Sequence, residues 1–254
     1  MQNIKQESNN NNQDKPVQVI VGPTGSGKTG LAINVAKALG GEVISADSRA
    51  IYKAMDIGTA KPSIEEMDGV PHFGIDLVGP GERFTVVDFQ AYARQKIDEI
   101  RARGHLPIIA GGTGLYVDSL VFNYGFNNDV KITCSDRAKM DDNYFVLGID
   151  WSRPELRKRL LMRANKFFEQ DILGETKRVA EMYDADSQAM KSNIYPICLR
   201  LMAGEIDQDE AVREIELDDW HLAKRQLTWF KRNKEIHWME LDKAYEYILN
   251  KYKN

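Results

Sequence analysis

Hydrophobic and polar positions in the first half of the chain follow two alternating patterns. Short apolar runs typical of strands are bounded by glycine or polar residues and cover 17–21, 42–47, 106–112 and 144–150. Apolar residues at helical spacing occupy 28–40 and 84–104, and each of these segments ends at a glycine. Strands that alternate with helices predict an α/β fold with a parallel sheet covered by helices on both faces.

The second half of the chain has a different pattern. From Trp151 onwards the apolar spacing is helical, which predicts a helical C-terminal part. The first 15 residues are polar and rich in asparagine, so we expect a disordered tail over 1–15. The remaining predicted units are an α/β core over 16–122, a polar segment without a clear period over 123–143, and a last core strand with the helical part over 144–254.

A glycine-rich turn matches a phosphate-binding motif. Residues 22–29 fit the pattern G-x-x-x-x-G-K-[ST] and lie between a predicted strand and a predicted helix, as this motif requires. Glycines let backbone N–H groups approach phosphate oxygens, a lysine adds charge, and the final hydroxyl can bind Mg²⁺. The sequence therefore predicts a P-loop with Thr29 as metal ligand and with phosphate-binding residues Gly22, Thr24, Gly25, Ser26, Gly27, Lys28 and Thr29.

Two more polar residues follow predicted strands. Asp47 ends the second strand, where its carboxylate could hold Mg²⁺, act as a general base, or cap the N-terminus of a helix. Thr113 lies in a glycine turn after the third strand, and this turn by itself indicates plain turn chemistry rather than a site. Ligands of parallel sheets bind beyond the carboxyl ends of the strands, so we expect both residues to lie near the P-loop.

Two basic stretches are candidates for anion contacts. Arg159 and Arg163 are four positions apart and share one helical face, which either faces solvent or clamps a diphosphate. Residues 221–234 combine five Lys and Arg residues with Trp229 and Phe230. An amphipathic helix packed on the core is the simpler interpretation of this stretch, and an RNA-facing patch is the more specific one.

Composition limits the possible functions. With 34 basic and 38 acidic residues the net charge is −4, so any contact with nucleic acid would depend on local patches. Cys134 and Cys198 lack the spacing of a zinc module or a disulfide framework, which fits a reducing cytosol. No apolar run approaches the roughly 20 residues of a membrane span. We expect a cytoplasmic protein without a membrane segment, and a monomer is the plain expectation.

Taken together, these stretches resemble the tRNA dimethylallyltransferase (tRNA isopentenyltransferase) family. Two of the segments, "MDIGTAKP" and "KRQLTWF", are far more specific than a P-loop. The resemblance covers most of the chain apart from the tail and 123–143. Its segments, in the order of the family, are "GPTGSGKT", "ADSRAIYKAMDIGTAKP" (46–62), "VPHFGIDL" (70–77), "VVDFQ" (86–90), "PIIAGGTGLYV" (107–117) and "LAKRQLTWFKR" (222–232).

The resemblance implies a specific reaction, the transfer of a dimethylallyl group from its diphosphate to the exocyclic amine of the adenosine beside the anticodon. It implies that the P-loop, Arg159 and Arg163 hold the diphosphate with Mg²⁺, that Asp47 accepts the proton of the amine, and that Thr113 hydrogen-bonds at the reacting centre. The target base must also be flipped out of its stack. Contacts with the tRNA anticodon arm are implied for Asp47, Ser48, Arg49, Ala50, Thr113, Lys224, Arg225, Gln226 and Trp229.

The chain departs from the family pattern in parts that bind the acceptor. Members of the family usually insert a helical domain where this chain has only 123–143, so the fold is expected to carry a reduced insertion. They often have Gln at the position of Ala50, and usually Gly-Tyr in place of Ile194-Tyr195. Three alternatives stay open: an adenylate isopentenyltransferase acting on free AMP, a small-molecule P-loop kinase, and a non-catalytic RNA-binding remnant.

Overall fold

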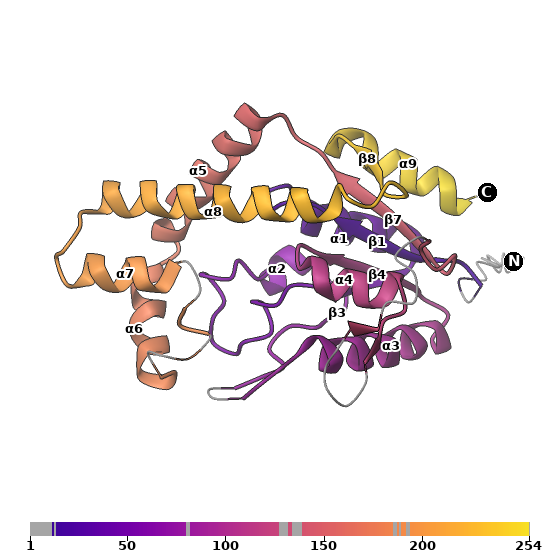
Figure 1. The fold of residues 1–254 in the computed structure, drawn as a ribbon, viewed down its shortest axis with the longest axis horizontal. Helices are drawn as coiled ribbons and strands as arrows, with labels where there is room; N and C mark the ends of the chain where they lie inside the picture. Colours follow the sequence, from indigo (N-terminus) through magenta and orange to yellow (C-terminus); the bar gives the residue numbers. More distant parts are fainter. Residues whose placement is uncertain are drawn as a thin grey trace, which may run out of the picture.

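The structure, a computed structural model, contains a six-stranded sheet in which every pair of neighbouring strands is parallel (Figure 1). The strand order is β3-β2-β4-β1-β7-β8. The strands are β1 (Val17–Val21), β2 (Gly41–Ser45), β3 (His72–Phe73), β4 (Leu106–Gly111), β7 (Tyr144–Ile149) and β8 (His237–Met239). The described residues are 12, 14–79, 82–126, 132–133, 139–184, 187, 189–191 and 194–253. This sheet confirms the predicted α/β fold class.

Helices cover both faces of the sheet. One face packs against α1 and α9, and the other packs against α3, α4 and the end of α8. The central strands are buried along their whole length, which explains their largely apolar sequence. The helices are α1 (Lys28–Leu39), α2 (Ile64–Met67), α3 (Val86–Ala102), α4 (Gly114–Val121), α5 (Arg153–Glu169), α6 (Ile172–Met182), α7 (Ile194–Met202), α8 (Gln208–Phe230) and α9 (Leu241–Lys253).

The helices α5 to α8 form a layer beside the sheet with a hydrophobic core of its own (Figure 1). Side-chain caps start three of the long helices: Thr85 accepts a hydrogen bond at the start of α3, Ser152 at α5 and Asp207 at α8. The 23-residue helix α8 begins in the second core and ends with Phe230 in the core of the sheet. It therefore ties the helical layer to the strands beside the P-loop.

Two short strands of the six-stranded sheet were not predicted from the sequence. β3 pairs with β2, and β8 pairs with β7 at the edge of the sheet. The prediction that 144–150 is the last strand of the core is therefore wrong, because the chain returns to the sheet at β8. A strand of three residues carries too little alternation to be distinguished from the helical pattern around it.

Two of the predicted units lie partly outside the described residues. Within 123–143 the described residues include two strands, β5 (Gly125–Phe126) and β6 (Ile132–Thr133), which pair antiparallel. Residues 127–131 and 134–138, with Cys134, lie outside the described part of the chain. So does most of the tail predicted over 1–15, although Lys15 is described and donates a hydrogen bond from Nζ to the carbonyl oxygen of Tyr252 at 2.7 Å.

None of the helices in the described part of the chain combines the length and the apolar character needed to cross a bilayer. Of the two cysteines, Cys198 is described, and it is a buried free thiol.

Candidate active site

The P-loop lies at the carboxyl edge of the sheet, between β1 and α1. Gly25 and Gly27 have φ angles of 73° and 86°, a left-handed conformation that glycine adopts without strain. Helix α1 begins directly after this turn, and the N–H groups of Lys28 and Thr29 donate to no acceptor among the described residues. These free N–H groups and the helix dipole favour an anion at this point.

Lys28 points back over the loop that precedes it. Its Nζ atom donates a hydrogen bond to the carbonyl oxygen of Pro23 at 3.1 Å. Burial lowers the pKa of the Lys28 ammonium to about 8, although the nearby carboxylate of Asp47 acts in the opposite direction. The P-loop thus holds a desolvated cation that an incoming anion would stabilise.

Helix α5 places Arg159 against the P-loop. Its Nε atom donates to the carbonyl oxygen of Gly25 at 2.7 Å, and its guanidinium lies 4.6 Å from the ring centre of Trp151. The indole Nε1 of Trp151 in turn donates to the carbonyl oxygen of Ser26 at 3.0 Å. These contacts fix the orientation of Arg159, so its remaining N–H groups stay beside the phosphate-binding turn.

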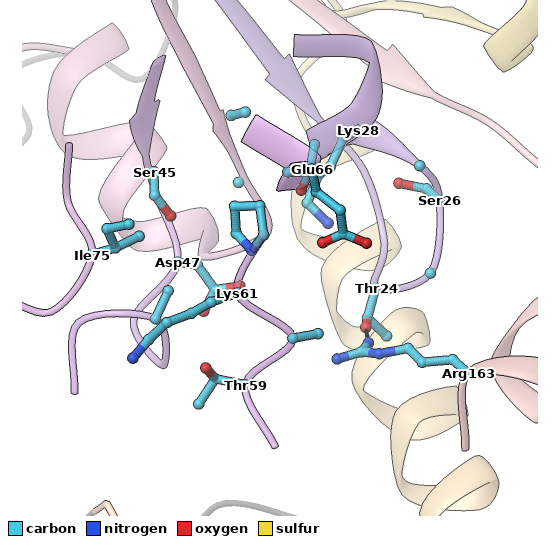
Figure 2. A pocket seen from close by; sticks show the side chains of 18 of the residues that line it. Thr24, Ser26, Lys28, Ser45, Asp47, Thr59, Lys61, Glu66, Ile75 and Arg163 are labelled. Atoms are coloured by element: carbon cyan, nitrogen blue, oxygen red, sulfur yellow. Dashed lines mark hydrogen bonds between the residues drawn. The ribbon is translucent and has the colours of Figure 1, made fainter. Parts of the chain in front are cut away.

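Arg163, one turn further along α5, reaches the same loop. Its Nη1 atom donates a hydrogen bond to the hydroxyl of Thr24, as Figure 2 shows, and lies 3.4 Å from Oδ2 of Asp219 on α8. Its guanidinium lies 5.1 Å from the ring centre of Phe167. The two arginines predicted from their spacing therefore both lie at the P-loop rather than on a solvated face.

Asp47 and Thr113 lie on adjacent loops, beyond β2 and β4. The Oδ1 atom of Asp47 accepts a hydrogen bond from the backbone N–H of Arg49 at 2.8 Å. No helix begins at this point, so Asp47 closes a turn and does not cap a helix. The hydroxyl oxygen of Thr113 accepts from the N–H of Ser48 at 2.9 Å, and its O–H donates to the hydroxyl of Ser48 at 3.2 Å. Thr113 thereby holds the Asp47 loop against the end of β4.

Two adjoining cavities meet at these residues. The first, which we call the P-loop cavity, has a volume of about 460 Å³ and an apolar wall that includes Val43, Ile75 and Ala110. The second, the α8 cavity, has a volume of about 300 Å³ and is lined by residues of the Asp47 loop, the Thr113 turn and α8. Both cavities are lined by Thr24, Lys28, Asp47, Thr59 and Arg163. Figure 2 shows Asp47 and Lys61 on one side of the P-loop cavity, with Thr24 and Arg163 on the other.

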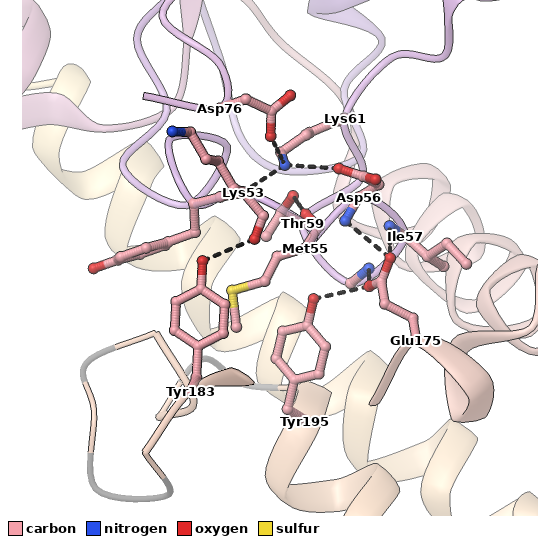
Figure 3. A network of polar contacts seen from close by, with 12 residues as sticks. Lys53, Met55, Asp56, Ile57, Thr59, Lys61, Asp76, Glu175, Tyr183 and Tyr195 are labelled. Carbon is pink, nitrogen blue, oxygen red and sulfur yellow. Dashed lines mark hydrogen bonds and ion pairs between the residues drawn. The ribbon is translucent and has the colours of Figure 1, made fainter. Parts of the chain in front are cut away.

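A loop between β2 and α2 brings Thr59 to the junction of the two cavities. The carboxylate of Glu175 on α6, which is 3% exposed, accepts hydrogen bonds from the N–H groups of Asp56, Ile57 and Gly58 at 2.9, 2.7 and 2.8 Å. The hydroxyl of Tyr195 donates to the same carboxylate at 2.8 Å (Figure 3). The helical layer therefore fixes a loop that lines the site.

Lys61 fixes the other end of this loop. Its side chain is 4% exposed, and Nζ lies 2.8 Å from Oδ1 of Asp56 and 2.6 Å from Oδ1 of Asp76 (Figure 3). Nζ also donates to the carbonyl oxygen of Tyr52 at 2.6 Å. Lys61 lines the P-loop cavity, but its charge is already neutralised within the protein.

Comparison with known proteins decides the family. An IPP transferase family model matches residues 50–139 and 127–233, and an isopentenyl transferase model matches residues 15–76. The tRNA dimethylallyltransferase of Acetivibrio thermocellus is 34% identical over 89% of this chain and 92% of its own length. This chain belongs to the tRNA dimethylallyltransferase family.

Solved structures and a second relative agree with this family. A tRNA isopentenylpyrophosphate transferase of Bacillus halodurans superimposes with a TM-score of 0.82 at 29% identity and covers 94% of this chain and 97% of its own. One from Staphylococcus epidermidis gives 0.81 at 30% identity, with 94% and 99% covered. The tRNA dimethylallyltransferase of Staphylococcus haemolyticus is 34% identical over 87% of this chain and 85% of its own length.

This family member is shorter than its relatives. The alignment with the Acetivibrio protein runs over 287 positions and this chain has 254 residues, so at least 33 positions (287 − 254) have no counterpart here. The reduced insertion expected over 123–143 stays a prediction.

The residues for which the resemblance implied tRNA contacts occupy different environments. Ala50 is buried in the wall of the P-loop cavity. Gln226 accepts from the N–H of Thr24 at 2.7 Å with Oε1 and donates to the carbonyl oxygen of Gly112 at 3.1 Å with Nε2, so it joins the P-loop to the Thr113 turn. The indole N–H of Trp229 donates to Oδ2 of Asp118 at 2.9 Å.

The basic stretch on α8 is exposed only in part. Lys224 and Arg225 are exposed, and with Trp229 and Arg232 they line an open groove of about 640 Å³. Arg225 lines both this groove and the α8 cavity, so the two hollows lie next to each other along α8. One face of the stretch packs on the core, as the simpler interpretation expects, and the other face presents cations. That these cations face RNA stays a prediction.

Residues that sequence reasoning missed include Thr59, Lys61 and Asp219, which line the cavities, and Glu175 behind them. For Asp219 a signal was available, because it is seven positions before Gln226 and two turns of a helix bring the two onto one face.

The oxygen donors at the P-loop fit one kind of metal ion. Among the described residues, no group of three or more His, Cys, Asp or Glu side chains is placed to hold a metal. Thr29 and Asp47 offer a hydroxyl and a carboxylate to the same cavity. Mg²⁺ commonly uses one or two protein oxygens together with phosphates and water. The donor set therefore fits Mg²⁺ that is bound together with a diphosphate.

Proposed function

We propose that this chain transfers a dimethylallyl group from dimethylallyl diphosphate to the exocyclic amine of the adenosine beside the anticodon in tRNA, with release of diphosphate. The observation that carries the proposal is the junction of the two cavities. Lys28 and Arg163, which can stabilise a leaving diphosphate, and Asp47, which can accept a proton, line both cavities. A donor and an acceptor that enter from different cavities would meet between these groups.

On the donor side, the P-loop would hold the diphosphate. The free N–H groups of Lys28 and Thr29 and the charges of Lys28, Arg159 and Arg163 converge on this loop. Such preorganised donors stabilise the charge that develops on the leaving oxygen when the allylic C–O bond breaks. The apolar wall with Val43 and Ala110 would take the hydrocarbon part of the donor. Mg²⁺, held by Thr29 and the phosphates, would supply further charge neutralisation.

On the acceptor side, an unstacked base would enter the α8 cavity. Formation of the new C–N bond requires loss of one N–H proton, which the carboxylate of Asp47 would accept. The hydroxyl of Thr113 lines the same cavity and would hydrogen-bond at the reacting centre. Ser48, Arg49 and Gln226 line this cavity as well and would contact the extruded nucleotide.

The groove along α8 favours tRNA over free AMP as the acceptor. Lys224 and Arg225 are exposed beside Trp229, and the groove that they line adjoins the α8 cavity at Arg225. Cations along an open groove suit a polynucleotide backbone, while a single nucleotide needs only the inner cavity. We expect the anticodon arm to lie along this groove and the protein to act as a monomer.

Label transfer tests the proposal. The protein is incubated with dimethylallyl diphosphate labelled in the allyl group and with tRNA, AMP, or ATP plus small acceptors. Label is expected in tRNA. Label in AMP but not in tRNA would overturn the proposed acceptor, and phosphate transfer from ATP without prenyl transfer would overturn the proposed reaction.

Asp47→Asn separates the proposed role of Asp47 from a structural one. The amide oxygen can still accept from the N–H of Arg49, so the turn is preserved, but the proton acceptor is lost. The rate of transfer is expected to fall by about 10²- to 10⁴-fold while diphosphate binding persists. A transfer rate close to that of the wild type would instead show that Asp47 serves the turn and is not the proton acceptor.

A further inference from the structure

Two arginine–carboxylate pairs connect helix α5 to helix α8, and they differ in completeness. In the first pair, Nε and Nη2 of Arg157 donate to the two carboxylate oxygens of Glu216, both at 2.8 Å. This is the bidentate geometry in which both groups are satisfied. Neither residue lines the P-loop cavity or the α8 cavity.

The second pair, Arg163 and Asp219, is left open. Its single contact is the 3.4 Å approach of Nη1 to Oδ2, and the same Nη1 also donates to Thr24. The Nε atom of Arg163 and the Oδ2 atom of Asp219 are buried, and neither has a hydrogen-bond partner among the described residues. Buried polar groups are rarely left in this state, so the unpartnered Nε of Arg163 at a cavity points to a hydrogen-bond acceptor that the protein does not itself supply.

The position of the open pair identifies the chemistry of that partner. Arg163 lines both cavities and contacts the P-loop, whereas Asp219 lines only the α8 cavity and is 8% exposed. The charges of Lys28 and Asp219 also influence each other across this space. An anion that binds the P-loop would be attracted by Arg163 and Lys28 and repelled by an ionised Asp219.

We propose that Asp219 is a positioning residue that holds Arg163 beside the P-loop in the empty site and competes with the diphosphate for this guanidinium. This inference rests on the proposed function, in that it takes a diphosphate as the ligand of the P-loop. Asp219 weakens the binding of the donor and of the released diphosphate alike. Because product release limits many enzymes, a carboxylate that takes back the arginine favours turnover.

Asp219→Asn tests this competition, with Glu216→Gln as the matched control on the same helix. Binding of inorganic diphosphate in the presence of MgCl₂ is measured by calorimetry on the full chain. We expect Asp219→Asn to bind on the order of tenfold more tightly, since a neutral amide competes less with the diphosphate for the guanidinium of Arg163. Glu216→Gln is expected to bind within about twofold of the wild type. Unchanged or weaker binding by Asp219→Asn would overturn the proposal.

A double-mutant cycle shows whether Asp219 acts through Arg163. In an Arg163→Ala background, the tightening caused by Asp219→Asn is expected to be largely lost. If it persists in full, Asp219 acts on the ligand directly and the positioning role is wrong. Asp219→Ser provides a second variant in case the asparagine disturbs folding, and the same tightening is expected from it. Thermal unfolding of each variant identifies any that is misfolded.

Enzyme kinetics separates this inference from the proposed function. In Asp219→Asn, the inhibition constant for product diphosphate is expected to fall by the same factor as the dissociation constant, an effect that a merely structural role would not produce. If diphosphate binds more tightly but no label reaches tRNA even in the wild type, the proposed function fails and the competition stands. If tRNA is labelled while the inhibition constant stays unchanged, the proposed function stands and the competition fails.

Discussion

Two loops at the active site each carry a cluster of consecutive backbone N–H groups. The two clusters differ in whether the protein supplies an acceptor for these groups. At Asp56–Gly58, three N–H groups surround the carboxylate of Glu175. At the P-loop, the N–H groups of Lys28 and Thr29 have no acceptor among the described residues. Both are anion sites of the same kind, built from main-chain donors. The chain supplies the anion for the first and leaves the second for a ligand.

The comparison separates stability from function. The filled cluster is fully satisfied and buried, so it stabilises the fold and positions Thr59. The open cluster carries free donors and the desolvated ammonium of Lys28, which cost folding free energy that ligand binding recovers. Substitutions in the two clusters should therefore affect different measurements.

Lys28→Met should produce the largest effect on activity. Removal of the ammonium is expected to lower kcat/KM for dimethylallyl diphosphate by about 10³-fold, as the loss of a donor to a developing anion typically does. The unfolding temperature should stay the same or rise, because an apolar side chain avoids the cost of burying a charge. Steady-state kinetics and thermal unfolding measure the two effects.

Lys61→Met is the control for this lysine, because Lys61 lines the same cavity but is paired with Asp56 and Asp76. It is expected to lower the unfolding temperature. Should Lys28→Met keep more than a tenth of the activity, the open cluster would not be the site of the leaving group.

Glu175→Ala should produce the largest effect on stability. Three buried N–H groups and the hydroxyl of Tyr195 lose their acceptor, with an expected cost of about 3–5 kcal/mol in the free energy of unfolding. Urea unfolding measures the change. Glu181, an exposed residue on the same helix, is the control, and Glu181→Ala is expected within about 0.5 kcal/mol of the wild type. Equal costs for both variants would refute a structural role of the carboxylate.

Two glycines test the packing of the same regions with smaller effects. A Cβ atom at Gly58 would lie 2.7 Å from Cζ of Tyr195 and 2.8 Å from Cγ2 of Ile194, so Gly58→Ala is expected to destabilise by about 1–3 kcal/mol. At Gly30 in α1 a Cβ atom would meet nothing within 4 Å, and Gly30→Ala is expected to stabilise by about 0.5–1 kcal/mol. Chemical denaturation of both variants should give shifts of opposite sign.

The parts of this molecule that the sequence predicted well are those determined by neighbouring residues. The strands over 17–21 and 106–111 are largely apolar runs, and the P-loop has its glycines and lysine within eight positions. The helical spacing of Arg159 and Arg163 likewise indicated a shared face, and both side chains lie at the P-loop.

The contacts that position the site join residues far apart in the chain, and no local pattern encodes them. Gln226 binds a P-loop residue 202 positions away, and Glu175 binds Asp56 at a separation of 119. The strand β8 has three residues, and its pairing with β7 rather than its own composition makes it a strand. The incomplete pairing of Arg163 with Asp219 depends on the distance between α5 and α8, and only the folded chain defines this distance.

A pH dependence also follows from the pKa of Lys28. Because burial lowers this pKa to about 8, the ammonium is present at pH 7 and mostly lost at pH 9. The affinity of the free protein for inorganic diphosphate should therefore fall by roughly tenfold over this range, beyond any change due to ionisation of the diphosphate itself. Lys28→Arg keeps its charge throughout, so its titration corrects for the ligand. If the affinities of the wild type and of Lys28→Arg changed equally with pH, Lys28 would not be desolvated in the empty site. The open and the filled cluster would then not differ in the burial of an unpaired charge.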